Sequence, residues 1–279
     1  MNKRVLAKVA LYAFLALSVV LAGFPLLYAI IGSFKTTVEF LTSGASLFPK
    51  RWMWQNYADA WRLANFSRFT VNSLGYALWT IAGALITSTL TGYVLSRANF
   101  AGKRLLIAAF IATLFVSGAL TLFPIYKLCL DLGLTNSILG LSLAEIGVSQ
   151  PLFCLLTMGY INGISREIDE SAKIDGCSFF RIYWNIILPI IRPMLATIVI
   201  LQFRRAWNDF MMPLAFTMSK PELRPLTVGI VMMKDQGEGI SAWNLMIPGT
   251  VISLVPMIVV YLVMNKFFIK GITEGALKG

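Results

Sequence analysis

The sequence predicts an all-α membrane protein in which six transmembrane helices form one domain over residues 1–279. Of the 279 residues, 57% are hydrophobic and 13% are charged, and the mean hydropathy is +0.74. A soluble protein carries about 25% charged residues. Apolar windows of about 20 residues, the length that crosses a hydrocarbon core, recur along the whole chain. No polar stretch between them is long enough to bury a core of its own.

The first predicted span, 9–31, follows three basic residues and contains Phe24-Pro25. Its apolar region is too long for a signal peptide, and a bulky residue before proline does not suit a cleavage site, so we expect an uncleaved helix. Five further spans form a core over residues 72–269: 72–95, 105–128, 137–160, 190–218 and 246–269. In the first of these five, small residues at four-residue spacing would let another helix approach closely: Thr80, Ala84, Ser88 and Gly92.

Lys and Arg outnumber Asp and Glu by 24 to 13, so the formal net charge is +11. In a soluble protein this excess would suggest nucleic-acid binding. Here the basic residues gather beside the ends of predicted spans, near the N-terminus, after the second and fourth spans, and in the C-terminal tail. Cytoplasmic segments carry such an excess, so we expect both termini and these loops in the cytoplasm. The same residues would contact lipid headgroups, and we expect no nucleic-acid partner.

The chain lacks two features that are common in enzymes and metal sites, namely histidine and closely spaced cysteines. It has no histidine, and its three cysteines, Cys129, Cys154 and Cys177, are widely separated. That spacing suits free thiols rather than a metal site. No G-x-x-x-x-G-K-[ST] phosphate-binding loop is present. We therefore expect no catalytic residue, no metal and no cofactor bound by this chain, and a membrane enzyme has little support.

Residues 165–193 form a polar segment between two predicted spans. The segment holds four of the 13 acidic residues: Glu167, Asp169, Glu170 and Asp175. Acidic residues suit the first turn of a helix, which we expect to run from Glu167 to Ile174. Gly176 would end that helix, and Pro189 would begin the fifth span. This ordered pattern, rich in bulky apolar residues, indicates a surface that docks a partner in water rather than a disordered connector.

Glu170-Ser171-Ala172, then Gly176, then Ile186 with Leu188-Pro189 resemble the signature E-A-A-x3-G-x9-I-x-L-P of the membrane subunits of bacterial ABC importers. Ser171 replaces the usual alanine, which is a change between small residues. The fuller run I-D-E-S-A-K-I-D-G is similar to that of the carbohydrate-uptake branch, which includes maltose-type and glycerol-phosphate-type permeases. Further matches cover most of the chain, including Trp207-Asn208-Asp209-Phe210 and the tail 271–279.

The resemblance implies a type I ABC importer permease in the bacterial inner membrane. Segment 165–193 would carry a coupling helix that docks into a separate ATPase subunit. The residues implied in this coupling are Glu167, Asp169, Glu170, Ser171, Ala172, Asp175 and Gly176. The tail would reach between the ATPases through Thr273, Gly275 and Lys278.

The implied partners are a homologous second permease, two cytoplasmic ATPase subunits and an extracytoplasmic solute-binding protein that delivers a sugar. ATP and magnesium would be bound by the ATPase subunits. A chain without a nucleotide site has to obtain free energy from such a partner, through a contact that differs between two conformational states.

Arg204 and Arg205 lie inside the apolar run of the fifth predicted span. Charged residues at that depth usually face a cavity or a partner. Adjacent helical residues point about 100° apart, so we expect only one arginine to face the transport path and Asp209 to pair with Arg205. Arg204 would then help to conduct an anionic oligosaccharide, because a guanidinium binds a carboxylate through two hydrogen bonds. The predicted path residues are Gln202, Arg204, Trp207 and Asn208. The alternative is that both arginines only lock the bundle through ion pairs.

A stand-alone secondary transporter or channel is the competing function. It would be expected to carry a relay of acidic residues within its spans, whereas acids there are nearly confined to Glu145 and Asp209. A binding surface outside the bilayer is a separate possibility. Four aromatic residues cluster there, for which an interfacial segment and a sugar-stacking surface both remain open: Trp52, Trp54, Tyr57 and Trp61.

Overall fold

The computed structural model describes residues 3–42, 46–63, 65–233 and 242–276. These residues form helices and loops, and no β-strand occurs among them. The chain divides into two compact units, Met1–Ser67 with Gly229–Val255 and Arg68–Val228 with Pro256–Gly279. The all-helical architecture confirms the predicted fold class.

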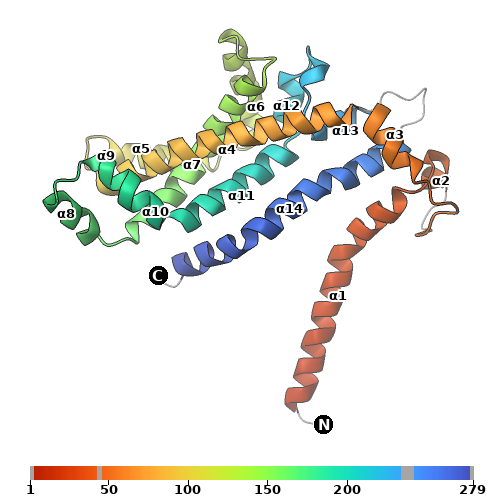
Figure 1. The fold of residues 1–279 in the computed structure, drawn as a ribbon, viewed down its shortest axis with the longest axis horizontal. Coiled ribbons are helices and arrows are strands. Elements are labelled where there is room, and N and C mark those ends of the chain that lie inside the picture. The colour runs from red at the N-terminus through yellow and green to blue at the C-terminus, as the bar shows by residue number, and fades with distance from the viewer. Residues whose placement is uncertain (1–2, 43–45, 64, 234–241, 277–279) are drawn as a thin grey trace. The chain divides into compact units, whose positions relative to one another are not determined.

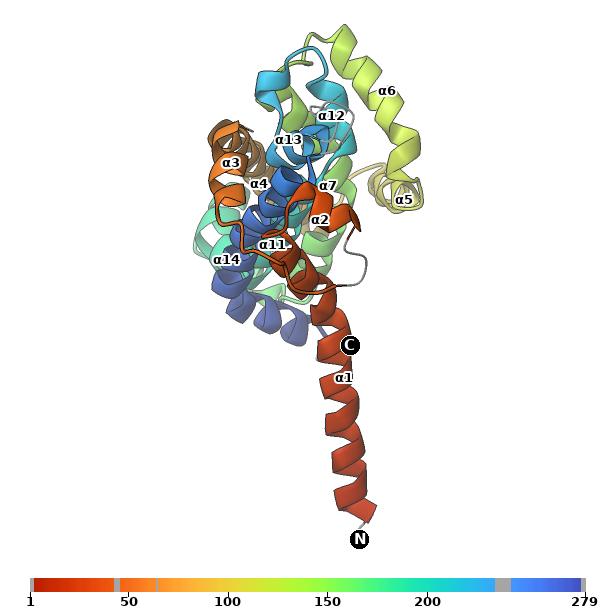
Figure 2. The ribbon, with the colours of Figure 1, turned by 90° about the vertical axis from the view of Figure 1, so that its right-hand side faces the viewer.

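The first unit contains α1 (Lys3–Gly32), α2 (Thr37–Thr42), α3 (Gln55–Leu63) and the beginning of α14 (Trp243–Ala276), shown in Figure 2. Three aromatic rings surround that of Phe34, with centroids 5.0, 4.6 and 5.3 Å away: Trp52, Trp54 and Tyr57. The buried amide of Asn56 donates hydrogen bonds of 2.9 Å to the carbonyls of Ser33 and Lys35. These contacts attach α3 to the end of α1, so most of the predicted aromatic cluster packs locally.

The second unit contains the remaining helices (Figure 1). Its long helices are α4 (Phe66–Arg97), α7 (Ile138–Asn162) and α11 (Arg192–Asn208), and its shorter ones are α5 (Lys103–Thr113), α6 (Gly118–Asp131) and α12 (Met211–Phe216). Between α7 and α11 lie α8 (Glu167–Ile174), α9 (Phe179–Ile182), a π-helical turn (Tyr183–Ile187) and α10 (Leu188–Ile190). A 3₁₀ turn (Pro221–Leu223) precedes α13 (Leu226–Met232), which extends into the first unit.

The predicted spans are confirmed as helices, with two corrections. Four helices are long and apolar enough to cross a membrane: Ala7–Gly32, Phe66–Arg97, Ile138–Asn162 and Trp243–Met264. The third predicted span is not continuous, because α5 and α6 meet at 112°. Ser117, which directly precedes α6, has an extended backbone, so the helix is interrupted between α5 and α6. Hydropathy does not detect such a bend, since both halves are apolar.

The fifth predicted span is also divided. Helix α11 ends at Asn208, because Asp209 has an extended backbone and its side chain binds the amides of Phe210 and Met212. An aspartate that bonds local backbone in this way competes with helix continuation. Pro189 lies in the short helix α10, which is bent by 76° from α11, so the prediction that it begins the span is wrong. Pro193 stands at the start of α11 instead.

The small residues of α4 do allow close packing, as predicted. A Cβ atom built on Gly92 would lie 2.7 Å from the side chain of Thr157 and 3.0 Å from the backbone nitrogen of Met158, both on α7. Thr80, Ala84 and Ser88 on the same face are fully buried. Helices α4 and α7 therefore meet nearly backbone to backbone at this point.

Candidate functional site

A cavity of about 780 Å³ lies within the second unit, beside the kink that follows α11. It is bounded by α6, α7, α11, α12 and one residue of α14. Its polar lining residues are Thr121, Glu145, Arg204, Arg205, Asn208 and Asp209. Its other lining residues are Gly118, Ala119, Leu122, Val148, Met211, Met212 and Met257. None of the described residues that line the cavity is aromatic, whereas three methionines supply flexible, polarisable side chains that adapt to ligand shape.

One cavity arginine is held by a carboxylate from a neighbouring helix. The Arg205 Nε atom lies 2.8 Å from Glu145 Oε1 and donates a hydrogen bond to it. The Glu145 side chain is 4% exposed and that of Arg205 is 39% exposed. The sequence suggested Asp209 as the partner of Arg205, and the structure corrects this to Glu145. A residue 60 positions away cannot be identified from helical spacing.

Asp209 is engaged by other groups. Its Oδ2 atom accepts a hydrogen bond of 3.2 Å from the hydroxyl of Tyr76 on α4, in addition to the two backbone amides that it caps. Tyr76 is fully buried, so Asp209 joins the wall of the cavity to α4. The carboxylate therefore has most of its acceptor capacity occupied by groups of this chain.

Arg204 is the cavity cation that remains available. It is exposed, and none of the ion pairs among the described residues includes it. Two guanidinium groups and two carboxylates line the cavity, so their formal charges cancel. Arg205 is paired with Glu145, so Arg204 is the cavity arginine that has no ion-pair partner among the described residues. The structure also places Arg205 on the cavity, which contradicts the expectation that only one arginine would face it.

The predicted path residues separate into two groups. Arg204 and Asn208 line the cavity, whereas Gln202 and Trp207 are buried and do not. Positions on an α-helix advance by about 100°, so four positions within seven residues cannot all face one side. Sequence reasoning did not assign Glu145 to the path, although its occurrence inside an apolar span was a signal.

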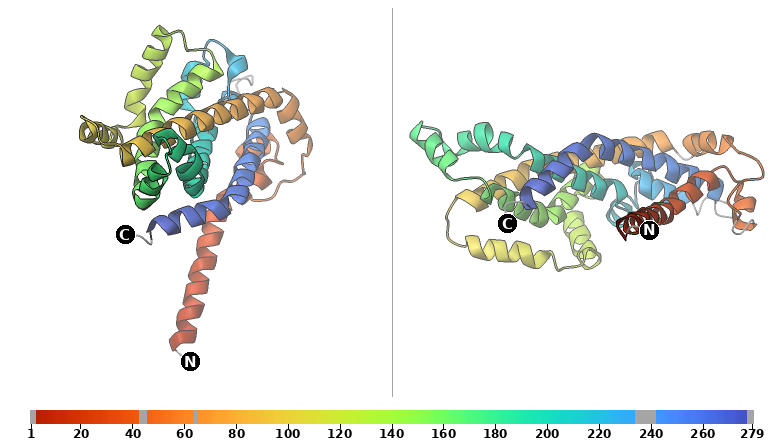
Figure 3. Two further views of the ribbon diagram at one scale, coloured as in Figure 1. Left: turned by 60° about the vertical axis from the view of Figure 1, so that its left-hand side comes forward. Right: turned by 90° about the horizontal axis from the view of Figure 1, so that it is seen from below.

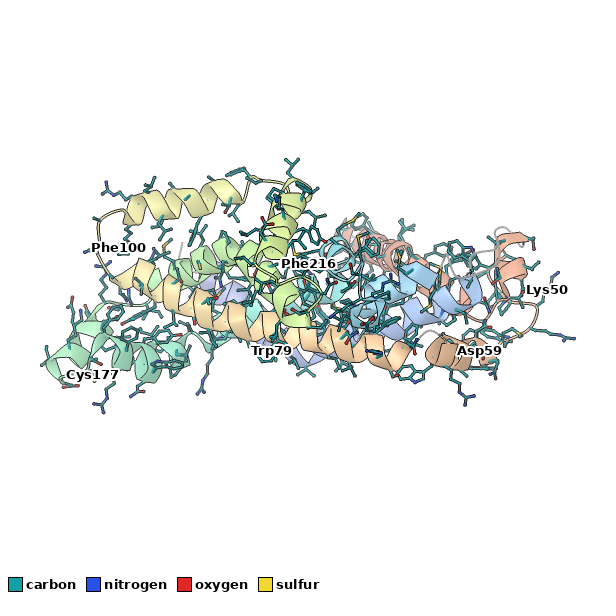
Figure 4. All side chains as sticks on the ribbon, turned by 90° about the horizontal axis from the view of Figure 1, so that it is seen from above. Lys50, Asp59, Trp79, Phe100, Cys177 and Phe216 are labelled. Atoms are coloured by element: carbon teal, nitrogen blue, oxygen red, sulfur yellow. The ribbon has the colours of Figure 1, made fainter. Side chains whose placement is uncertain are left out.

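The predicted coupling helix is found with the expected bounds, as α8 (Glu167–Ile174). Three acidic side chains are exposed on it or directly after it: Glu167, Glu170 and Asp175. Ile174 is 87% exposed among them, and Ser171 is also exposed. Gly176 follows with φ +79°, a left-handed conformation that favours glycine. Cys177, labelled in Figure 4, lies directly after this turn.

Two residues predicted for the docking face point the other way. Asp169 and Ala172 are 5% and 5% exposed, because they form the side of α8 that packs on this chain. The Asp169 Oδ2 atom lies 3.0 Å from Arg97 Nε at the end of α4. The side chains of Asp169 and Ala172 therefore do not lie on a surface that an ATPase could reach. The sequence of this segment does not indicate which of its four acidic side chains is buried.

The predicted tail residues are only partly described. Thr273 and Gly275 lie in the last turns of α14, and Lys278 lies outside the described residues. Their assignment to an ATPase contact stays a prediction.

Residues 89–272 match the family described as "Binding-protein-dependent transport system inner membrane component". The chain belongs to this family. The permease is 30% identical over 278 residues to the probable ABC transporter permease YurM of Bacillus subtilis, covering 100% of this chain and 91% of that protein. It is 29% identical to the arabinooligosaccharide permease AraQ of the same organism, covering 98% and 96%.

The fold of the permease is also that of a solved importer. A crystal structure of a bacterial ABC transporter, involved in import of the acidic polysaccharide alginate, contains a similar chain. The TM-score is 0.82 with 21% identity, and the likeness covers 96% of this chain and 98% of that one. The resemblance to carbohydrate-uptake ABC permeases and the type I importer fold are therefore confirmed.

Proposed function

We propose that this permease is a subunit of an ATP-driven, binding-protein-dependent importer of oligosaccharides, and that its cargo is anionic. The observation that supports the cargo is the cavity in which Arg204 has no ion-pair partner among the described residues. Relatives with names such as arabinooligosaccharide permease, and a fold shared with an alginate importer, support a saccharide.

The charge arrangement suits transit rather than tight storage. A single guanidinium binds a carboxylate through two parallel hydrogen bonds, which orients an acidic sugar. The formal charges of the lining cancel, so the cavity as a whole attracts an anion only weakly. Passage requires binding that is favourable enough for entry and weak enough for release. One unpaired guanidinium in a lining of zero formal charge therefore supports transit of an acidic saccharide.

The exposed face of α8 supports an ATPase as the energy source. Three acidic side chains and the protruding Ile174 present a charged rim around an apolar centre. Interfaces commonly combine an apolar core with such a polar rim. The partner surface would be basic and would hold a pocket for Ile174. A second permease and an extracytoplasmic solute-binding protein would complete the assembly in the inner membrane.

The cargo is tested with the assembled transporter, reconstituted with its solute-binding protein. Arg204→Gln should lower the stimulation of ATP hydrolysis by acidic oligosaccharides about 10-fold or more, because one charged hydrogen-bonding group of about 1.5–3 kcal/mol is lost. Stimulation by neutral oligosaccharides should stay within twofold. Lys127→Gln, which removes an exposed cation outside the cavity, is the matched control. Equal losses for acidic and neutral sugars would refute the anionic cargo.

The coupling is tested by affinity purification of the permease together with the ATPase. Glu170→Lys should release the ATPase, whereas Glu222→Lys, an exposed acid in another loop, should retain it. Gly176→Ala should weaken recovery, and Gly102→Ala supplies a control with the same backbone type, φ +85°. A Cβ has open space at both glycines, so the two changes carry a similar local strain. Retention of the ATPase by Glu170→Lys would contradict the docking role, and transport without any ATPase would support a stand-alone transporter.

A further inference from the structure

Helix α4 contacts several parts of the segment between α7 and α11. Near its end, the Ser96 hydroxyl lies 2.6 Å from Asn162 Oδ1, and the Arg97 guanidinium donates to the carbonyl of Ile164 at 3.0 Å. One turn earlier, the Tyr93 ring lies 4.5 Å from that of Phe179.

A further turn back, the Thr89 hydroxyl shares a hydrogen bond of 2.7 Å with Tyr183 in the π-helical turn. These α4 residues fall at positions that share one helical face. Figure 3 shows α8 and α9 gathered at this end of α4.

The contact between α4 and α8 itself is the Arg97–Asp169 ion pair. Its two side chains are 6% and 7% exposed, although most of α8 is exposed. A buried pair resists separation, because removing one partner leaves an uncompensated charge away from water. Exposed pairs have no such penalty and contribute little. Displacement of α8 would therefore move the end of α4 with it.

The other end of the same helix reaches the cavity. Tyr76, 21 residues before Arg97, donates its hydroxyl to Asp209 in the cavity wall. At 1.5 Å per residue, the two contacts lie about 32 Å apart along α4. The helix is continuous from Phe66 to Arg97 and contains no proline. The cavity arginine Arg204 lies five residues from Asp209 in the chain.

We propose that Arg97 and Asp169 are positioning residues that transmit movement of α8 along α4 to the wall of the cavity. The proposal rests on the proposed function, in which an ATPase docks on the exposed face of α8. It adds that docking and transmission use opposite faces of this helix. Glu170 holds the partner, and Asp169 carries the displacement into the bundle through Arg97.

The experiment uses the assembled transporter with its solute-binding protein and a stimulating oligosaccharide. The measured quantity is the ratio of stimulated to basal ATP hydrolysis for each bound ATPase. Arg97→Gln and Asp169→Asn should each keep the ATPase bound and lower this ratio at least fivefold. Arg104→Gln, an exposed basic residue on the adjoining helix, should leave the ratio within twofold of the wild type.

Several outcomes overturn the proposal. A lower yield of complex with an unchanged ratio would show a structural role only. Loss of the ATPase from Asp169→Asn would assign Asp169 to docking. Failure of the wild type to retain an ATPase would refute the proposed function itself, which separates the two hypotheses.

A conservative variant keeps the test decisive if Arg97→Gln does not assemble. Arg97→Lys retains the positive charge, but a single ammonium cannot reproduce the planar fork that reaches both Asp169 and the Ile164 carbonyl. The ratio should fall by twofold to fivefold. An unchanged ratio in assembled Arg97→Lys and Asp169→Asn transporters would overturn the transmission role.

Discussion

Replacing Arg205 and replacing Glu145, the two partners of one ion pair, should lower the stability of the permease by unequal amounts. The Arg205 side chain is 39% exposed and can turn further into the cavity, whereas the Glu145 side chain is only 4% exposed. Arg205→Met removes the charge and retains an apolar stem. It leaves Glu145 buried and unpaired. Glu145→Gln keeps the shape and an acceptor for Arg205.

The magnitudes follow from distance and burial. At 2.8 Å and an effective dielectric constant of 20, the attraction is about 6 kcal/mol before the cost of desolvation. Removing one partner of a buried ion pair lowers the free energy of unfolding by about 3–5 kcal/mol. Because Arg205 is partly exposed, we expect the lower limit, about 3 kcal/mol, for Arg205→Met. Glu145→Gln should lose about 1 kcal/mol, the value of an ordinary hydrogen bond.

The assay is SDS-induced unfolding of the assembled transporter, followed by tryptophan fluorescence. The midpoint should fall several-fold further for Arg205→Met than for Glu145→Gln. The double variant should recover most of the Arg205→Met loss, because it no longer buries a charge. Lys127→Met breaks an exposed pair with Asp131, 63% and 60% exposed, and should hardly move the midpoint. A double variant as unstable as Arg205→Met would refute the reasoning.

Three further variants test the packing by the same unfolding midpoints. Gly92→Ala forces α4 away from the backbone of α7, and the cost of overpacking should exceed the gain in helix propensity by about 1–2 kcal/mol. Gly83→Ala meets only the end of a flexible side chain and should lower the free energy of unfolding less. An equal loss for the two variants would contradict the backbone contact at Gly92. Ser73→Ala removes the 2.7 Å acceptor of the buried Leu226 amide and should lose about 1–2 kcal/mol, and an unchanged midpoint would mean that the amide finds another partner. Asn56→Ala leaves two carbonyls without donors and should lose about 1–3 kcal/mol, whereas a loss below about 0.5 kcal/mol would show that they are hydrated.

Much of the architecture follows from local patterns. Runs of about 20 apolar residues have no stable alternative to helix in a bilayer, so hydropathy located the helices, although two of the predicted spans are divided. The bounds of α8 followed from acidic residues in its first turn and from Gly176 after its end. The 112° bend could not be predicted, because α5 and α6 on its two sides are both apolar, whereas the 76° bend falls beside the predicted start of the fifth span.

The candidate site was only partly predictable, for a related reason. Arg204 and Asn208 were recognisable as polar residues in an apolar run, and both line the cavity. The face of each helix that is buried depends on its neighbours, so the sequence could not show that Gln202 and Trp207 are buried and do not line the cavity. Glu145 became a cavity residue only because α7 brings it beside Arg205, 60 positions away.

The sequence by itself determined the class of the protein, its helices and, through a motif, the segment expected to form a docking helix. Those properties depend on composition and on residues within a few turns of one another. The tertiary structure decided which charges are paired. It matched Arg205 with Glu145 and Arg97 with Asp169, and it left Arg204 open to the cavity. Ion pairs between helices depend on how the helices pack, which no local pattern records.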